Sequence, residues 1–526
     1  MNQIWNHILV PVLILLLFGC AGNSSTSPDA GAGPGPFTDF PATPILDGTA
    51  PASSPTLFPA GGGGGGPCLV EPEPGALFPS NWLRPRFRYL PASGENLFEL
   101  RVHAAREVND LVVYTSNPSW TMPQSMWRAL ASHILDEAIT ITIRGGVFDG
   151  QKLTAGPTVG AAGDIKIAPA DASGSIVYWT TSSGSALKGF SVGDESVHPL
   201  LTPAAVQTGC IGCHTSTPDG MFAAMSASDN PGDGAPARIE LRSVDGLNTR
   251  PSFLSTVAAT LLARTQQEAP QFSAAHWASG DRVALSMLEQ NGKTEIAWTN
   301  LEATDATQGV GWGLLARTGD NGSAASASFA HDGTRIAYVS GPAVNSGVNV
   351  YGGGADLHMI PYAARMGGAS TPIQGASDPA WSEFYPSFSP DDRLLVFDRV
   401  PAAETSYNNA NDELFFVRST GGDPVRAAAN DPPACSGRAS PGVTNSWAKW
   451  SPTVSPTSSK TYYWIIFSST RDEQKNPQLY MTGIEVPTGE LTAANIITHG
   501  AVYLWNQPAA EDNHTPAWDL LQIPLM

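Results

Sequence analysis

The stretch YPSFSPDDRLLVFDR, residues 385–399, decides the fold of most of the chain. Its apolar run 394–397 follows the turn residues Asp391 and Asp392, a pattern typical of strand, tight turn and strand. The segment SASFAHDGTRIAYVS, residues 326–340, has the same pattern with Asp-Gly in the turn. Both segments therefore predict β-hairpins.

Six units of this kind follow one another from about residue 163, with a period near sixty residues. Besides the two already quoted, they are IAPADASGSIVYWTT (167–181), CHTSTPDGMFAAMSA (213–227), PQFSAAHWASGDRVALSM (270–287) and AKWSPTVSPTSSKTYYWIIFSSTRD (448–472). A further apolar strand follows each unit. Such repeats indicate propeller blades, because a single sheet can bury its faces only against neighbouring sheets.

The segments YPSFSPDDRLLVF and ASFAHDGTRIAYVS resemble the repeat of TolB-type β-propellers. The resemblance covers residues 163–526 and implies an all-β, six-bladed propeller. The tail HTPAWD, residues 514–519, reads as one more first strand, and we expect it to close the ring by completing the first blade. We expect the repeat aromatics to pack in the core; they are Phe272, Phe329, Phe388, Trp450 and Trp518.

The segment before the repeats has a different pattern. Residues 67–150 contain short alternating runs and the β-branched strand AITITIRGG, residues 138–146. Their strand count predicts a small β-sandwich that resembles immunoglobulin-like or fibronectin type III domains. One helix is predicted over residues 123–135. We expect His103 and His133 to be ordinary surface or half-buried residues rather than ligands.

The N-terminus predicts export. The apolar run ILVPVLILLLF, residues 8–18, has the length of a signal-peptide core, and Leu17-Phe18-Gly19-Cys20 resembles a bacterial lipobox. The expected organisation is a signal peptide over 1–19, a lipidated Cys20, and a flexible Pro/Gly/Ser tether over 20–66. By the same resemblance, Ala21 after the lipidated cysteine implies sorting to the outer membrane. The alternative is an ordinary signal peptide that is cleaved elsewhere.

Composition restricts the partners. The chain has 526 residues, a formal net charge of −19 and no Lys/Arg-rich run, which argues against nucleic acid. No Gly-x-Ser-x-Gly, His-Glu-x-x-His or Walker motif occurs in a fitting context, so no hydrolase or transferase is predicted. The acidic pairs 391–392 and 194–195 lie at expected turns, which explains them without catalysis.

The pentapeptide Cys210-Ile-Gly-Cys213-His214 has the Cys-x-x-Cys-His spacing of a c-type haem site. In such sites both thiols attach the porphyrin and the histidine is the proximal iron ligand. The sequence also resembles exported bacterial TolB-like proteins that carry this motif within a blade. Two alternatives remain: a redox-active or structural Cys210–Cys213 disulfide, and a zinc half-site, for which no second Cys-x-x-Cys supplies ligands.

The remaining cysteines, Cys68 and Cys435, could form a disulfide in an oxidising compartment. For the second iron ligand the preferred residue is His514, because the tail strand should lie beside the blade that contains His214. The other possibilities are His276, His331, Met221, Met225 or no protein ligand.

Two functions fit these patterns. The first is a membrane-anchored propeller with a covalent haem that transfers electrons or senses redox state. Its expected partner is a redox protein or a cell-envelope protein. The second is a non-catalytic propeller scaffold for protein or cell-envelope interactions, in which Cys210 and Cys213 form a structural disulfide. Covalent haem would distinguish them.

Overall fold

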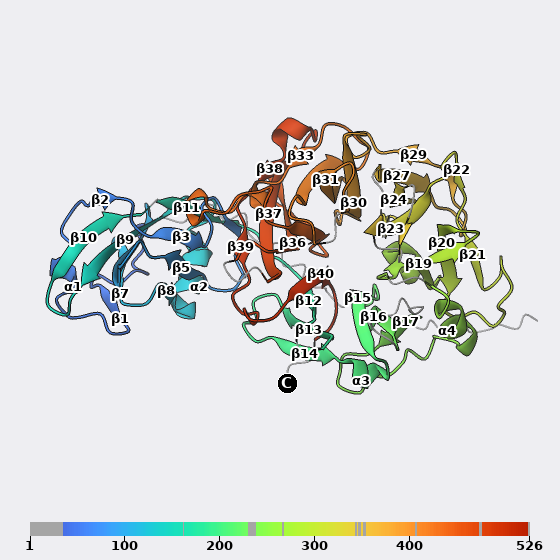
Figure 1. Cartoon of the computed structure of the whole chain (residues 1–526), viewed down its shortest axis with the longest axis horizontal. Helices are drawn as coiled ribbons and strands as arrows, with labels where there is room; N and C mark the ends of the chain where they lie inside the picture. Colours follow the sequence, from blue (N-terminus) through green and yellow to red (C-terminus); the bar gives the residue numbers. More distant parts are fainter. Residues whose placement is uncertain are drawn as a thin grey trace, which may run out of the picture.

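The structure is a computed structural model that describes residues 35–523, apart from 161, 183, 230–237, 266–267, 342–343, 346–348, 351–353, 406–407 and 473–475. The predicted signal peptide and Cys20 lie outside the described residues. The chain forms a narrow N-terminal unit and a ring of sheets beside it (Figure 1). Within the described part, no helix has both the length and the apolar character needed to span a membrane. The predicted all-β class is confirmed.

The N-terminal unit contains two sheets that share one apolar core. The larger sheet has eight strands, β1 (Ile45–Asp47), β7 (Leu111–Thr115), β6 (Leu97–Ala104), β9 (Ile139–Phe148), β10 (Leu153–Val159) and β2 (Gly63–Gly64), with β11 (Gly163–Ile167) and β4 (Leu77–Phe78) at its side. The smaller sheet contains β3 (Cys68–Glu71), β5 (Arg86–Leu90) and β8 (Ser119–Thr121). Helix α1 spans Ser54–Leu57, and the predicted helix is confirmed as α2, Gln124–His133.

Strand β9 shows how the sequence forms this unit. Its isoleucines 139, 141 and 143 are fully buried, whereas the threonines between them are only half-buried. Side chains alternate between the two faces of a strand, so a β-branched residue at every second position supplies one apolar face.

The expected tether and the expected domain limits are wrong in part. Residues 35–66 fold onto the N-terminal unit, because Phe40 and Phe58 are buried and the glycine-rich run pairs through β2 with β10. The unit also extends to residue 167, since β11 pairs with β9 and β4 rather than with the ring. The apolar residues of 35–66 thus bury enough surface to fix a segment that its composition predicts to be flexible.

The described residues after 172 form six antiparallel sheets that follow one another around a ring (Figure 1). From the inside of the ring outward, the first sheet contains β40 (Asn513–Asp519), β12 (Ser175–Thr180), β13 (Ala186–Ser191) and β14 (His198–Leu201), and the second contains β15 (Cys210–Ser216), β16 (Ala223–Ser228) and β17 (Arg238–Arg242). In the same direction, the third sheet contains β18 (Gln271–Phe272), β19 (Val283–Gln290), β20 (Lys293–Asn300) and β21 (Trp312–Leu314), and the fourth contains β23 (Ser323–Phe329), β24 (Arg335–Gly341), β27 (Asp356–Pro361) and β29 (Thr371–Pro372). The fifth sheet contains β30 (Trp381–Phe388), β31 (Leu394–Pro401), β32 (Glu413–Arg418) and β33 (Val425–Arg426), and the sixth contains β34 (Asn445–Trp450), β36 (Lys460–Ser469), β37 (Gln478–Pro487) and β38 (Ile497–Thr498), with β35 (Ser455–Pro456) and β39 (Val502–Tyr503) beside β36 and β37. This arrangement is propeller-like.

Shorter elements connect these sheets. They are α3 (Pro203–Val206), α4 (Thr256–Leu262), α5 (Ala274–Ala278), the paired strands β22 (Arg317–Thr318) and β28 (Gly368–Ala369), the paired strands β25 (Val344–Asn345) and β26 (Asn349–Val350), and the 3₁₀ turns η1 (Ala428–Asn430), η2 (Ala434–Ser436) and η3 (Ala493–Asn495).

The C-terminal strand closes the ring, as predicted. Strand β40 pairs antiparallel with β12, so the chain's tail supplies the innermost strand of the first sheet (Figure 1). Trp518 of this strand is 2% exposed and its Nε1 donates to the Ser173 carbonyl at 2.8 Å. Of the repeat aromatics expected in the core, Phe272 is half-buried and the other four are buried, and all five also line a cavity in the channel of the ring.

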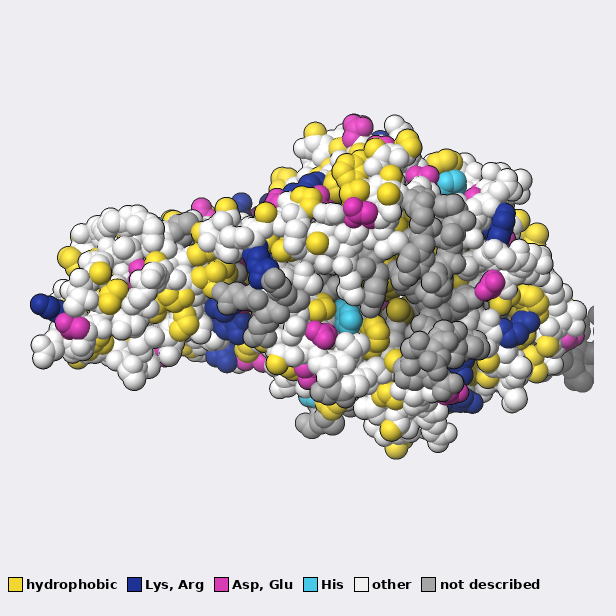
Figure 2. Space-filling view, in the orientation of Figure 1, with side chains coloured by type: hydrophobic (Ala, Val, Ile, Leu, Met, Phe, Trp, Pro, Cys, Tyr) yellow, Lys and Arg dark blue, Asp and Glu magenta, His cyan; other side chains and the backbone are white. Residues whose placement is uncertain are grey.

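The two units share a continuous interface. Trp82 of the N-terminal unit packs against Trp518 of the ring, with ring centroids 5.6 Å apart. The predicted disulfide between Cys68 and Cys435 is present and joins β3 to η2. Lys and Arg side chains appear along the boundary between the units in Figure 2. Among the ion pairs that cross it is Arg471 Nη1 to Glu73 Oε1, at 2.9 Å.

Candidate functional site

A cavity of about 220 Å³ lies in the channel of the ring, and residues of all six innermost strands or of the turns beside them line it. In five of these strands the pairing register shifts by a bulge. The residue that pairs first after each shift lines the cavity; these residues are His214, Ser328, Ser387, Lys449 and Ala517. The bulges, which re-aim side chains in a sheet, thus set the composition of the channel wall.

The bulges depend on unusual backbone conformations. Ser326, Tyr385, Trp447 and Thr515 have φ between 43° and 61°, and each lies within the shifted part of its innermost strand. Such left-handed conformations are costly for residues other than glycine, so the packing around the ring must hold them in place.

His214 is more buried than either cysteine of the predicted haem motif. It pairs with Met225 across the second sheet and is 4% exposed. Neither ring nitrogen has a partner at hydrogen-bonding geometry. Burial lowers the pKa of His214 to about 4, and the nearby backbone of Val177 and Gly212 offsets only part of this effect. The imidazole is therefore neutral at neutral pH.

Both cysteines of the motif are free thiols. The structure therefore does not contain the alternative Cys210–Cys213 disulfide. Cys213 packs against the apolar cluster of the fourth and fifth sheets, and burial raises the pKa of its thiol to about 12, with the negative charge of Glu268 adding to the effect. The half-buried Cys210 donates its Sγ hydrogen to the Ile211 carbonyl at 3.5 Å. Neither thiol lines the cavity that His214 lines.

Three ionisable groups near the motif were not predicted. Burial lowers the pKa of Lys449, against the opposing charges of Asp398, Asp519 and Glu268. Burial raises the pKa of Asp519, whose Oδ2 accepts the Ser216 amide at 2.7 Å, and raises that of Glu268 well above its ordinary value. Lys449 and Asp519 both line the channel cavity, whereas Glu268 does not. A desolvated acid and a desolvated lysine at one cavity mark a candidate binding site.

A signal for Lys449 does exist in the sequence. In AKWSP, Lys449 and Trp450 occupy the place that Ser328-Phe329 and Ser387-Phe388 occupy in their units. A lysine in the place of a serine is a departure from the repeat, and it puts a charge in the channel wall. Asp519 is the last residue of the predicted tail strand 514–519, and Glu268 precedes the third repeat unit, 270–287. The repeat pattern predicts a charged side chain at neither position.

His514, the preferred second iron ligand, is in the wrong place for that role. It stacks on Trp179, with ring centroids 4.8 Å apart and planes 10° apart, and lines a different, small cavity near Trp447. A Cβ atom on Gly212 would lie 3.9 Å from the same Trp179 ring, so this indole contacts both the motif strand and His514. The structure therefore does not bring His514 and His214 together at one cavity.

Of the other possible ligands, Met225 and His331 lie near His214, whereas Met221 and His276 have other surroundings. Met225 is the cross-strand neighbour of His214 and is buried in the apolar cluster between the first and second sheets, whereas Met221 is half exposed. The Nε2 of His276 lies 3.0 Å from the Gly333 carbonyl. His331 lines the channel cavity, but its Nδ1 lies 3.0 Å from Asp392 Oδ1.

Comparisons with known proteins give no family. No family model matches the chain, and no curated protein matches it. Among solved structures, hydrazine synthase from Kuenenia stuttgartiensis has a TM-score of 0.41 at 11% identity, over 66% of this chain and 47% of that one. The chain thus spans about half the length of that protein.

Two further solved structures are similar over most of their own length. A chain of a nidogen/laminin complex has a TM-score of 0.33 at 9% identity, over 64% of this chain and 99% of that one. A quinonprotein alcohol dehydrogenase-like protein from Bacteroides thetaiotaomicron has a TM-score of 0.28 at 8% identity, over 86% and 99%. At these TM-scores the likenesses carry no argument about function, which must come from the site itself.

Proposed function

We propose that the chain is an exported, lipid-anchored, six-bladed TolB-like propeller that carries a covalent c-type haem for electron transfer or redox sensing. In this proposal an immunoglobulin-like or fibronectin type III-like unit precedes the propeller, Cys20 bears the lipid, and the protein faces the periplasm or the cell surface from the outer membrane. One observation carries the haem: His214 is a buried, neutral imidazole without a hydrogen-bond partner, and two free thiols precede it within four residues.

The residue types of the motif fit a haem, although neither thiol lines the cavity that His214 lines. A buried polar group without a partner costs free energy, so an imidazole in this position calls for a ligand that is absent from the protein itself. A neutral imidazole has the lone pair that an axial iron ligand needs. Cys210 and Cys213 would hold the porphyrin through their thiols, neither of which forms a disulfide.

The surrounding residues would control the environment of the group. The haem, when bound, supplies one-electron redox chemistry. An apolar cluster that includes Val177, Ile211 and Met225 packs beside His214, between the first and second sheets. The motif lies on a strand instead of a short helix, and the bulge between Ile211 and His214 provides its irregular backbone.

The test is covalent haem on the exported protein. We expect the chain, produced together with haem-maturation enzymes, to give a c-type pyridine haemochrome spectrum and peroxidase staining after denaturing electrophoresis. The double variant Cys210→Ser/Cys213→Ser should lose both signals. The matched variant Cys68→Ser/Cys435→Ser removes the same number of cysteines elsewhere and should keep both signals. A colourless wild-type protein whose mass excludes porphyrin would contradict the haem proposal.

A second function is favoured by a different observation. The cavity in the channel is lined from all six sheets and contains the desolvated Lys449, which suits a propeller scaffold that binds a protein or cell-envelope partner there. In that case Lys449→Met should abolish partner binding, and Cys210→Ser/Cys213→Ser should leave it unchanged. Pull-down from envelope extracts with the three proteins distinguishes the two functions.

A further inference from the structure

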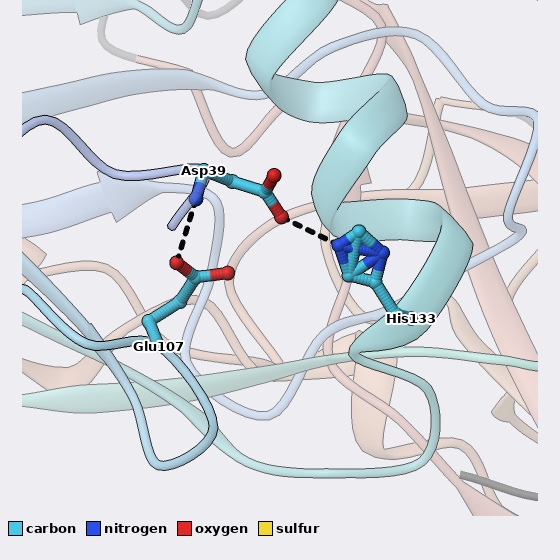
Figure 3. A group of neighbouring side chains, drawn as sticks. All are labelled: Asp39, Glu107 and His133. Atoms are coloured by element: carbon cyan, nitrogen blue, oxygen red, sulfur yellow. Dashed lines mark hydrogen bonds and ion pairs between the residues drawn. The ribbon is translucent and has the colours of Figure 1, made fainter. Parts of the chain in front are cut away.

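Three side chains from distant parts of the sequence meet in the N-terminal unit (Figure 3). Asp39 belongs to the segment before β1, Glu107 to the turn after β6, and His133 is the last residue of α2. One ligand atom of each residue lies within 4.8 Å of the other two. All three residues are partly or largely buried, and none of them belongs to the channel of the ring.

The hydrogen bonds fix the tautomer of His133. Ser132 Oγ donates to the Ala129 carbonyl at 2.7 Å, so its hydrogen is already used. His133 Nδ1 lies 2.8 Å from this oxygen and must therefore donate to it. The neutral imidazole then presents a lone pair at Nε2, which lies only 2.6 Å from Asp39 Oδ2. Two acceptors cannot face each other at this distance unless a proton or a metal ion lies between them.

Glu107 favours a metal ion over a proton. Its Oε2 accepts the amide hydrogens of Asp39 at 2.9 Å and Phe40 at 3.4 Å, whereas its Oε1 has no partner although the residue is only 9% exposed. This free oxygen points into the space between Asp39 and His133 (Figure 3). A proton at His133 satisfies Asp39 alone and leaves Oε1 unpaired.

We propose that Asp39, Glu107 and His133 bind a divalent transition-metal ion of the zinc type. An imidazole nitrogen with two carboxylate oxygens is a donor set for such ions, whereas calcium and magnesium prefer oxygen ligands alone. The Nδ1 bond to Ser132 is the outer contact that orients a metal-binding histidine. Zinc ligands at about 2.0–2.1 Å from the metal lie roughly 3.3 Å apart in a tetrahedron, so small shifts of Asp39 and Glu107 suffice.

The ion would fasten the first described segment to the N-terminal unit. Phe37 already donates its amide to the Arg106 carbonyl at 2.7 Å and accepts that of Val108 at 2.8 Å. Its ring also lies 3.8 Å from that of His133. Metal bound between Asp39 and His133 adds a strong link between residues 37–40 and helix α2. Consequently, zinc should slow proteolysis and amide exchange in residues 37–40.

The proposal is tested with zinc chloride alone on the full chain after removal of metal by EDTA. We expect wild-type protein to bind one zinc per chain by calorimetry and to retain it through dialysis, as measured by plasma mass spectrometry. Glu107→Gln and His133→Gln should lose this equivalent. Ser132→Ala keeps all three ligands and should weaken zinc binding by about 10–100-fold. Calcium and magnesium should bind at least tenfold more weakly.

The matched control is a second histidine–aspartate pair of the same unit. His103 Nδ1 lies 2.8 Å from Asp110 Oδ1, and His103→Gln should keep the zinc. Cys210→Ser/Cys213→Ser should also keep it, which separates this site from the haem proposal. Circular dichroism identifies variants that fail to fold; if both ligand variants fail, Ser132→Ala decides. The proposal would be overturned if the wild-type protein bound no zinc. It would also be overturned if Glu107→Gln and Ser132→Ala left the zinc content and the zinc affinity unchanged.

Discussion

At the scale of single residues, partners decide what each histidine can do. His214 is buried without a hydrogen-bond partner, and burial lowers its pKa to about 4. His133 is half-buried and faces a carboxylate across 2.6 Å. The first environment favours a neutral ligand to a large group, and the second favours a small cation. The two histidines are therefore suited to different ligands, His214 to a haem and His133 to a metal ion.

The lowered pKa of His214 predicts a pH dependence of stability in protein without haem. The unfolded chain takes up a proton near pH 6.5, whereas the folded chain resists it until about pH 4. Stability is thus lost as pH falls from 6.5 to 4, by on the order of 3 kcal/mol at about 1.4 kcal/mol per pKa unit. Urea unfolding at pH 7 and 4.5 should show a smaller loss for His214→Gln than for wild type. Equal losses would contradict the assignment.

At the scale of elements, irregular strands build the site. The bulge in β15 puts His214 in the channel wall, and the equivalent bulge in β34 puts Lys449 there. A regular strand would alternate strictly and send each of these side chains to the other face. The disulfide acts at the same scale, because it joins β3 of the N-terminal unit to η2 of the ring.

Removing this disulfide should destabilise the protein. Cys68 and Cys435 are 367 residues apart in sequence, and a link across so long a chain restricts the unfolded state strongly. We expect Cys68→Ser/Cys435→Ser to lose about 2–5 kcal/mol of unfolding free energy in denaturant titrations. Cys210→Ser/Cys213→Ser is the control, since these thiols are free. Stability insensitive to reducing agent in the wild type would contradict the expectation.

At the scale of the whole molecule, the C-terminal strand β40 connects the ring of sheets to the N-terminal unit. Strand β40 completes the first sheet, lines the channel, and packs through Trp518 against Trp82 of the N-terminal unit. The tail thus couples ring closure to the interface between the two units.

Substitution of Trp518 tests this coupling. Trp518→Ala removes a buried indole and its hydrogen bond to Ser173, which should cost about 3–5 kcal/mol. The neighbouring Leu520 is 51% exposed, so Leu520→Ala should change stability by less than about 0.5 kcal/mol. Chemical denaturation followed by circular dichroism measures both. Similar stabilities for the two variants would show that ring closure does not depend on this contact.

The sequence by itself determined the local structure. The turn residues and apolar runs predict the paired strands of five repeats, the closing strand at 514–519 and the buried aromatics, and helix 123–135 is found at 124–133. The first unit, 167–181, forms no hairpin, because β11 pairs with β9 and β4 of the N-terminal unit. These features depend on neighbours a few residues apart, so periodicity is sufficient to detect them.

Only the tertiary structure decided which side chains meet. Register shifts bring His214 and Lys449 to one cavity and leave His514 at another, and the packing of Phe40 and Phe58 orders a segment that composition predicts to be a tether. Contact between Asp39 and His133 joins positions 94 residues apart. The physical reason is that bulges and long-range packing depend on the whole ring and its neighbour, whereas composition and period record only what lies nearby along the chain.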